Sequence, residues 1–316
     1  MGAREEETGA GKDISERLAL GTVQLGMPYG ILGSTPPPEP QVAQLLEVAW
    51  DEGVRYYDTG QAYGKSEELL GAFLPPRGRF GSPRIITKLH PDACLETAPE
   101  IERRLEDSRA RLGARDMWAL LLHRDRMIER WDGDLGDVLR RWRRQGRIRH
   151  LGISVETLEA LPAALAVDDI EVVQLPASVF DRRVIDSGFN ERARRAGKRI
   201  LVRSVYFQGM AVADTERVRA HAPAAADMVG AYAEFCKRHG LDRRRFAVGY
   251  VRRRLPGAIL VIGAETPDQA RENCRLIAGT PASAALCDAW DEAWRSPDDS
   301  VIDLPRLGAQ LSPRRA

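Results

Sequence analysis

Short apolar runs alternate with amphipathic stretches along most of this chain. Runs of apolar and β-branched residues with the length of a strand occupy positions 17–22, 54–58, 84–88, 118–123, 148–154, 171–175, 199–204 and 258–263. Between them, apolar residues recur three and four positions apart, as one buried helix face requires, at 42–52, 66–73, 101–112, 135–145, 190–196 and 228–239. Eight strand signals separated by helices predict an α/β fold, a parallel (β/α)8 barrel in a single domain.

The segments between these elements predict where the long loops lie. Proline-rich residues 34–40 follow the first strand and predict a loop that leads into a helix. Residues 125–136 and 206–226 are long enough to form loops over the carboxyl-terminal mouth of the barrel. We expect residues 1–14 to form a flexible tail and residues 15–316 the barrel domain, whose last part, from 296, either covers the mouth or is partly disordered.

Four polar side chains lie at or near the ends of successive predicted strands. Asp58 and Tyr63 belong to the stretch 57–64, Lys88 ends the apolar run 85–88, and His123 ends the run 120–123. A charged or titratable side chain in an apolar run is costly unless it has partners. Active sites of (β/α)8 barrels lie at the carboxyl ends of the strands. The four residues are therefore predicted to share one polar site.

Proton transfer to a carbonyl group is the chemistry that these residue types favour together. A tyrosine becomes a stronger acid when an ammonium group beside it favours the phenolate, so Lys88 would activate Tyr63. Asp58 would keep Lys88 charged, and His123 would hydrogen-bond the substrate oxygen. Such a positioned acid contributes roughly 10²–10⁴-fold in rate. Taken alone, Asp58 also fits a turn cap, Tyr63 a half-buried aromatic and His123 a core histidine, and it is their joint occurrence that favours catalysis.

The stretch from Asp58 to Gly64, with Lys88 and His123 after it, resembles the catalytic tetrad of the aldo-keto reductase family. From about Leu18 to Asn273 the order of motifs is similar to that family. The resemblance implies a TIM barrel that uses a nicotinamide cofactor to reduce an aldehyde or a ketone. Two alternatives stay open, an NAD-linked dehydrogenase of a sugar or secondary alcohol and a cofactor-sensing binding module with little turnover.

The resemblance also implies which residues bind cofactor and substrate. The implied cofactor contacts are Gly21, Thr22, Asp58, Ser154, Gln174, Arg203, Ser204, Gly263, Glu265, Gln269, Glu272 and Asn273. The implied substrate contacts are Tyr29, Tyr63 and His123. Two positions depart from the family pattern. Val155 replaces an asparagine, which removes one contact to the carboxamide, and Arg203 replaces an aromatic residue that stacks on the nicotinamide, although a guanidinium also offers a planar face.

The cofactor that the resemblance implies by default is NADPH, with NADH as the alternative. Many relatives place cations on the adenosine 2′-phosphate, where this chain has Gly263, Ala264 and Gln269. Glu265 lies nearby, and an acid at this position disfavours the phosphate, as in other dinucleotide sites. Arg271 is the candidate cation that would compensate. The backbone amides that open the helix after Pro267 are a further candidate for holding a phosphate.

Composition narrows the class of protein but does not by itself indicate a reductase. The 316 residues are 43% hydrophobic and 29% charged, with a net charge of +1, which gives no electrostatic footprint for nucleic acid or membrane. The four cysteines lack the spacing of a metal site or a disulfide framework, so we expect no metal and buried thiols in a reducing compartment. We expect a cytoplasmic enzyme with a small-molecule carbonyl substrate, whose oligomeric state stays open.

Overall fold

A closed barrel of parallel strands forms the centre of the computed structural model, which describes residues 14–74, 82–294 and 299–302. Each strand pairs with the next, and the last pairs with the first, so the described sheet has no free edge. The strands are β1 Leu18–Gly21, β2 Tyr56–Asp58, β3 Arg84–Leu89, β4 Met117–Leu122, β5 Ile148–Ser154, β6 Ile170–Pro176, β7 Arg199–Arg203 and β8 Ile259–Gly263. The predicted (β/α)8 TIM barrel is thereby confirmed.

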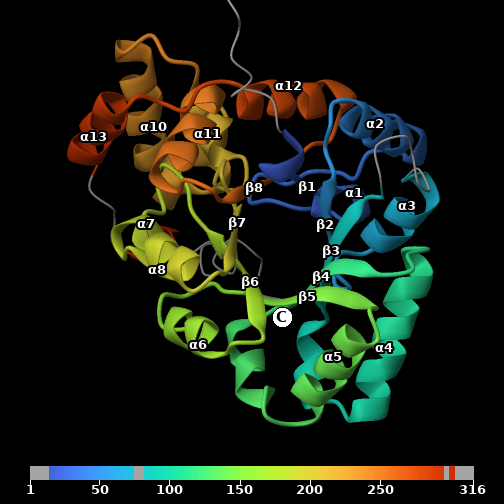
Figure 1. The fold of residues 1–316 in the computed structure, drawn as a ribbon. Helices are drawn as coiled ribbons and strands as arrows, with labels where there is room; N and C mark the ends of the chain where they lie inside the picture. The colour runs from blue at the N-terminus through green and yellow to red at the C-terminus, as the bar shows by residue number, and fades with distance from the viewer. Residues whose placement is uncertain (1–13, 75–81, 295–298, 303–316) are drawn as a thin grey trace, which may run out of the picture.

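Helices surround this sheet (Figure 1). The α-helices are α1 Val23–Gly26, α2 Glu39–Asp51, α3 Ser66–Phe73, α4 Ala98–Arg111, α5 Asp134–Arg144, α6 Leu161–Ala166, α7 Arg183–Asp186, α8 Phe189–Arg195, α9 Thr215–His221, α10 Pro223–Arg238, α11 Arg243–Arg254, α12 Pro267–Ala278, α13 Ala284–Ala293 and α14 Asp299–Ile302. Short 3-10 helices are η1 Ile14–Glu16, η2 Pro91–Leu95, η3 Asp125–Arg130 and η4 Met210–Val212. Because helices cover its outer face, the sheet is buried on both sides and its strands are apolar along most of their length.

The core has an inner and an outer layer. A small cluster inside the barrel includes Tyr56 and Trp118, whose rings meet edge to face with centroids 4.7 Å apart. A much larger cluster lies between the sheet and the helices and includes the fully buried Trp142 of α5. Many of the residues that fill both layers are apolar positions of the predicted strands and helix faces, whereas Phe246, Tyr250 and Trp290 lie outside those segments.

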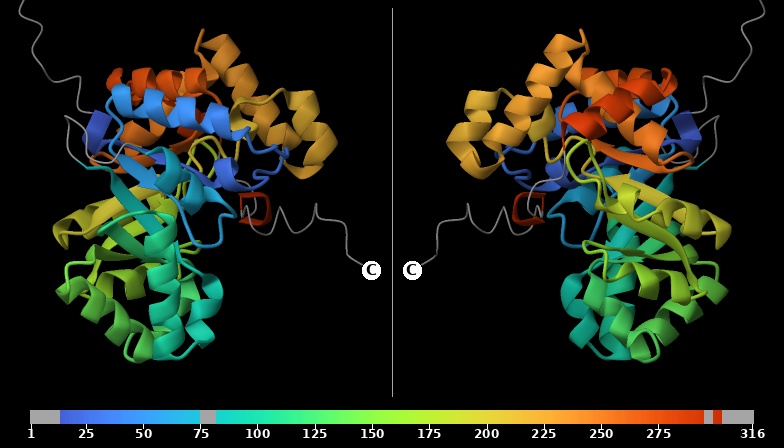
Figure 2. Two further views of the ribbon diagram at one scale, coloured as in Figure 1. Left: turned by 90° about the vertical axis from the view of Figure 1, so that its right-hand side faces the viewer. Right: turned by 90° about the vertical axis from the view of Figure 1, so that its left-hand side faces the viewer.

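Two segments that were predicted to be loops hold helices instead. Residues 206–226 contain η4, α9 and the start of α10, and residues 125–136 contain η3. Asp214 caps α9 by accepting hydrogen bonds from the amides of Glu216 and Arg217. The side chain of Arg217 donates to the carbonyl of Leu32 at 3.2 Å, which ties α9 to the loop that follows α1. Figure 2 shows α9 and α10, in yellow and orange, beside that blue loop.

The ends of the chain and two internal stretches lie outside the described residues, namely 1–13, 75–81, 295–298 and 303–316. Of the tail predicted at 1–14, only Ile14 is described, and it begins η1. The predicted loop at 34–40 leads into α2, which begins at Glu39 with Pro38 at its N-cap. Cys236, Cys274 and Cys287 are buried free thiols, as expected. None of the described helices is long and apolar enough to cross a bilayer.

Candidate active site

Strand register brings the predicted site residues to one end of the barrel. Gly21 at the end of β1 lies opposite Asp58 on β2 and opposite Gly263 on β8. Ser154 on β5 lies opposite Gln174 on β6. All five residues lie at or near the carboxyl ends of their strands, which is the end where barrel enzymes build active sites.

A buried ion pair forms the centre of the site. The Nζ of Lys88 lies 2.7 Å from each carboxylate oxygen of Asp58 and 2.9 Å from the carbonyl oxygen of Thr59. Lys88 is 1% exposed and Asp58 4%. Burial opposes the charge on Lys88, but the Asp58 carboxylate outweighs it together with Tyr63, so the pKa of Lys88 is raised. The Asp58 carboxylate therefore favours the protonated form of this buried amine.

Tyr63 and His123 lie above this pair. The Nζ of Lys88 is 4.9 Å from the centre of the Tyr63 ring. The Tyr63 and His123 rings meet edge to face, with centroids 5.5 Å apart. Burial, followed by the charges of Lys88 and Arg124, lowers the pKa of His123 to about 3. His123 is therefore neutral near pH 7, and within the described part of the chain its buried Nδ1 has no hydrogen-bond partner.

Gln174 and Ser154 extend the network beyond the ion pair. The side-chain amide of Gln174 donates to Asp58 at 2.7 Å, and the hydroxyl of Ser154 donates to Gln174 at 3.4 Å. Both side chains are buried. The resemblance implied that they bind the cofactor carboxamide. Here the Gln174 amide also fixes the orientation of Asp58, a contact that the sequence did not predict.

A pocket at the mouth collects most of the other predicted residues. The predicted cofactor and substrate residues that line it are Gly21, Tyr29, Asp58, Tyr63, Gln174, Arg203, Ser204, Gly263, Glu265 and Gln269. The predicted residues outside its lining are Thr22, Lys88, His123, Ser154, Glu272 and Asn273. Thr22 is turned away because its hydroxyl donates to the carbonyl of Asp58 at 2.9 Å and contacts the hydroxyl of Ser66. Its predicted role in binding is carried by its backbone at most.

Two glycines and one unpartnered hydroxyl belong to the pocket lining. Gly21 and Gly263 form part of its lining, and a Cβ atom on Gly263 would lie 1.7 Å from the side-chain nitrogen of Gln24. The hydroxyl of Ser204, which also lines the pocket, is buried without a hydrogen-bond partner in the described residues. A buried polar group of this kind usually has a partner in the functional state of a protein. The Ser204 hydroxyl is therefore available to a ligand in the pocket.

Backbone strain is concentrated in the loop that follows β7. Ser204, Phe207 and Gln208 have positive φ angles of 61°, 51° and 51°, a conformation that side chains disfavour. Ser204 and Gln208 line the pocket, and Phe207 is buried beneath it. Non-glycine residues persist in this region only when the surrounding structure holds them there, and they cluster at ligand sites. The buried Phe207 ring, edge to face with Phe180, provides that hold.

The far end of the pocket lies beside α12. Thr266 caps this helix by accepting from the amide of Gln269, so that amide is already used within the protein. Asn273 donates to the carbonyl of Gly263 at 3.1 Å and accepts from the hydroxyl of Tyr206 at 3.3 Å. Arg271, the candidate compensating cation, instead pairs with Asp268 at 3.0 Å.

Gln24 and Arg244 are among the pocket residues that sequence reasoning missed. Arg244 on α11 lines the pocket, lies 5.7 Å from the Tyr206 ring and has Glu272 as a distant ionic partner at 3.8 Å. Its neighbours in the sequence are all arginines, which gave no signal that one of them faces a ligand. Among the described residues, no cluster of three or more metal-ligating side chains is found.

Comparisons with known proteins agree with this geometry. A family model described as Aldo/keto reductase family matches residues 17–295. A pyridoxal 4-dehydrogenase from Microbacterium luteolum is 25% identical over 305 residues, which cover 81% of this chain and 87% of that protein. A D-threo-aldose 1-dehydrogenase from Pseudomonas sp is 29% identical over 163 residues, which cover 42% of this chain and 49% of that protein.

Solved structures share the same fold. A glycerol dehydrogenase from Gluconobacter oxydans has a TM-score of 0.68 at 21% identity, with 88% of this chain and 90% of that chain covered. An aldo/keto reductase from Klebsiella pneumoniae, in complex with NADP and acetate, has a TM-score of 0.66 at 17% identity, with 89% and 92% covered.

Proposed function

The chain belongs to the aldo/keto reductase family and is an NAD(P)H-dependent oxidoreductase, and on this premise we propose that it reduces an aldehyde or ketone to an alcohol with Tyr63 as proton donor. The observation that supports this most directly is the buried Lys88–Asp58 pair beside the Tyr63 ring. When bound, the nicotinamide supplies the hydride. The same residues serve the reverse reaction, in which the alcohol returns its proton to Tyr63.

The role of each side chain follows from its charge. Tyr63 gives its proton to the carbonyl oxygen as negative charge develops there, and the Lys88 ammonium stabilises the phenolate that remains. Asp58 holds Lys88 in place and charged. His123, neutral at working pH, donates a hydrogen bond from one ring nitrogen to the substrate oxygen and sets its approach. Ser154 and Gln174 would hold the carboxamide, and Ser204 would bind elsewhere on the cofactor.

Replacing the proposed acid tests this function. Tyr63→Phe removes the proton donor and keeps the ring, so we expect kcat for aldehyde reduction to fall roughly 10²–10⁴-fold. Binding of NADPH, followed by its fluorescence, should stay close to wild type. Tyr56→Phe is the matched control, because that phenol lies inside the barrel and hydrogen-bonds Arg84. A Tyr63→Phe protein with wild-type turnover would remove the proposal, and absence of turnover with any aldehyde in the wild type would favour a cofactor-sensing module.

For the cofactor, we infer a preference for NADPH that Arg244 provides. Arg244 lines the pocket and lies 3.8 Å from Glu272 of α12, at the end where we propose that the adenosine binds. Glu265 also lines the pocket and limits the preference through its charge. Arg244→Gln should weaken NADPH binding about 10-fold and NADH binding little, since a hydrogen bond to a charged group contributes about 1.5–3 kcal/mol. Arg245→Gln, an exposed neighbour, is the control.

The second candidate is an NAD-linked dehydrogenase of a sugar or secondary alcohol. It is favoured by Glu265 at the pocket and by the names of the pyridoxal, aldose and glycerol dehydrogenases that this chain resembles. Measuring kcat/KM in both directions with both cofactors separates the candidates. Faster oxidation with NAD⁺ than reduction with NADPH would replace the first proposal by the second.

A further inference from the structure

Arg203 is a cation at the mouth with few partners. It ends β7, lines the pocket, and its side chain is 21% exposed. Within the described residues its guanidinium makes a single hydrogen bond, to the carbonyl of Val155 at 3.3 Å. Its nearest carboxylate oxygen, on Glu156, is 3.7 Å away. Since a guanidinium carries five N–H donors, most of the donors of Arg203 are available to a ligand.

A second guanidinium shares the same carboxylate. Arg124 directly follows His123, and its Nη1 donates to the same Glu156 oxygen. Asp125, the other carboxylate beside Arg124, accepts hydrogen bonds from the backbone amides of Glu156 and Thr157. Two arginines therefore share the Glu156 carboxylate, whereas Asp125 bonds to the segment at 156–157 and to neither of them.

This charge acts where the carbonyl is proposed to bind. Arg124 and Arg203 both contribute to the lowered pKa of His123, after burial and Lys88. Arg203 lines the same pocket as Tyr63, so a substrate bound beside Tyr63 occupies a pocket that the Arg203 guanidinium borders. Carboxylates and phosphates bind arginine through two parallel hydrogen bonds, a geometry that Arg203 does not make with Glu156.

We propose that the substrate carries an anionic oxyacid group beside its carbonyl, and that Arg203, assisted by Arg124, binds this group. The proposal rests on the proposed function and names its substrate class. In the free enzyme Glu156 lies where it partly neutralises the two arginines, so it competes with the anion of the substrate. Neutral carbonyl compounds leave the arginines without a new partner and gain nothing from them.

Three matched aldehydes test the proposal: 4-carboxybenzaldehyde, 4-formylphenyl phosphate and the neutral methyl 4-formylbenzoate. We expect wild type to have a higher kcat/KM for at least one of the anionic aldehydes, and the two of them distinguish a carboxylate from a phosphate. In Arg203→Met, the ratio of anionic to neutral kcat/KM should fall about 10- to 100-fold, the usual effect of losing a charged hydrogen bond. Glu156→Gln should raise the same ratio. Arg126→Gln, an exposed arginine two residues from Arg124, should leave it unchanged.

The ratio separates this role from binding of the cofactor. If Arg203 contacted only the cofactor, its replacement would change NADPH affinity and lower kcat/KM equally for all three aldehydes. Calorimetry measures the same preference without turnover. The binding affinities of 4-(hydroxymethyl)benzoate and of neutral 4-methylbenzyl alcohol are compared on protein saturated with NADP⁺. Tighter binding of the anionic alcohol by wild type, lost in Arg203→Met, is the expected result.

Two outcomes would overturn the inference. One is equal kcat/KM for the charged and neutral aldehydes in wild type, and the other is an unchanged ratio in both Arg203→Met and Glu156→Gln. If wild type reduces the neutral ester well without preferring the anions, the proposed function stands and this inference falls. If no aldehyde is reduced, the proposed function fails, and the calorimetry still decides whether the mouth selects an anion.

Discussion

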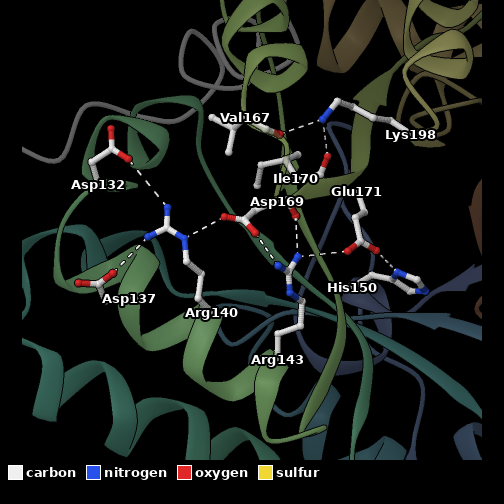
Figure 3. A network of polar contacts seen from close by, with 10 residues as sticks. All are labelled: Asp132, Asp137, Arg140, Arg143, His150, Val167, Asp169, Ile170, Glu171 and Lys198. Carbon is white, nitrogen blue, oxygen red and sulfur yellow. Dashed lines mark hydrogen bonds and ion pairs between the residues drawn. The ribbon is translucent and has the colours of Figure 1, made fainter.

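The two ends of the barrel each hold a polar network, and the networks differ in how their charges are paired. At the mouth, Lys88 and Asp58 form a buried ion pair. At the amino-terminal end, Arg140 and Arg143 of α5 share Asp169, and Arg143 also contacts Glu171, which pairs with His150 (Figure 3). These side chains are between 25% and 37% exposed.

The difference supports the proposal that the network at the mouth is the functional one. A buried ion pair costs desolvation and is weak evidence for stability, so a fold that keeps one gains something else from it. Here the gain is a charged ammonium beside Tyr63. The open network has several alternative pairings, because Arg140 contacts Asp132, Asp137 and Asp169. Loss of one contact there leaves others, and its position at the amino-terminal face of the barrel fits a role in stability.

The largest expected effect comes from Lys88→Met. It removes the proposed activator of Tyr63 and leaves Asp58 buried without its cation, so we expect both loss of turnover and a fall of about 3–5 kcal/mol in the free energy of unfolding. Urea denaturation and kcat measure the two effects. The double variant Lys88→Met with Asp58→Asn should recover most of the stability and none of the activity. Recovery of activity in the double variant would contradict the assigned role of Lys88.

Asp169→Asn, in contrast, should lower stability while leaving kcat/KM unchanged. Asp169 accepts hydrogen bonds from Arg140 and Arg143, which outweigh its burial and lower its pKa. Losing these charged contacts should cost about 1–3 kcal/mol, measured by urea denaturation at pH 7. Asp132→Asn is the control, because that fully exposed carboxylate lies 3.9 Å from Arg140. A large fall in kcat/KM for Asp169→Asn would break the division between the two ends.

Local sequence patterns explain which helices and strands could be predicted and which could not. Strand 148–154 and helix 66–73 have the bounds that the sequence predicted, and each buries apolar residues of the predicted pattern, among them Leu151 and Leu70. α9 was missed, since Val218 is its one buried residue, and α6 was missed because its sequence LPAALA lacks a polar face. Such helices are defined by their tertiary contacts and not by a local pattern.

The candidate site divides in the same way. Asp58 and Lys88 were predicted because each is a charge beside an apolar run, which is a local signal. Arg244 was not predicted, because its direction depends on how α11 packs beside the pocket. The contact between Gln174 and Asp58 joins residues 116 positions apart and follows from closure of the barrel. Contacts of this kind need the fold before they can be inferred.

Protonation of His123 should make the stability of the protein depend on pH. Its pKa of about 3 lies below the ordinary 6.5, so the folded protein favours the neutral ring. The stability that this provides is complete above pH 6.5 and is lost as the pH falls toward 3. We expect it to contribute about 1–2 kcal/mol to the loss of stability between pH 7 and 5. His123→Gln should lose correspondingly less over that range in urea denaturation, whereas replacing the exposed His221 should change nothing.

The smallest expected effect concerns Lys198, the amine of the network in Figure 3. It donates to the carbonyls of Val167 and Ile170 at 2.9 and 2.6 Å, and burial lowers its pKa in spite of Asp168 and Glu171. Because the folded state binds this proton less tightly than the unfolded state does, wild type should gain stability relative to Lys198→Met as the pH rises from 8 toward 10. We expect less than about 1 kcal/mol, with no change in kcat/KM.

Lys237→Met is the matched control, since Lys237 is exposed near the end of α10. Its replacement should leave the pH dependence of the free energy of unfolding as it is in wild type. If wild type instead lost stability relative to Lys198→Met as the pH rose, the Lys198 amine would behave like Lys88, whose pKa is raised by a carboxylate. Lys198 would then stabilise the fold in its protonated form, as Lys88 does. The two ends of the barrel would no longer differ in how they treat a buried lysine.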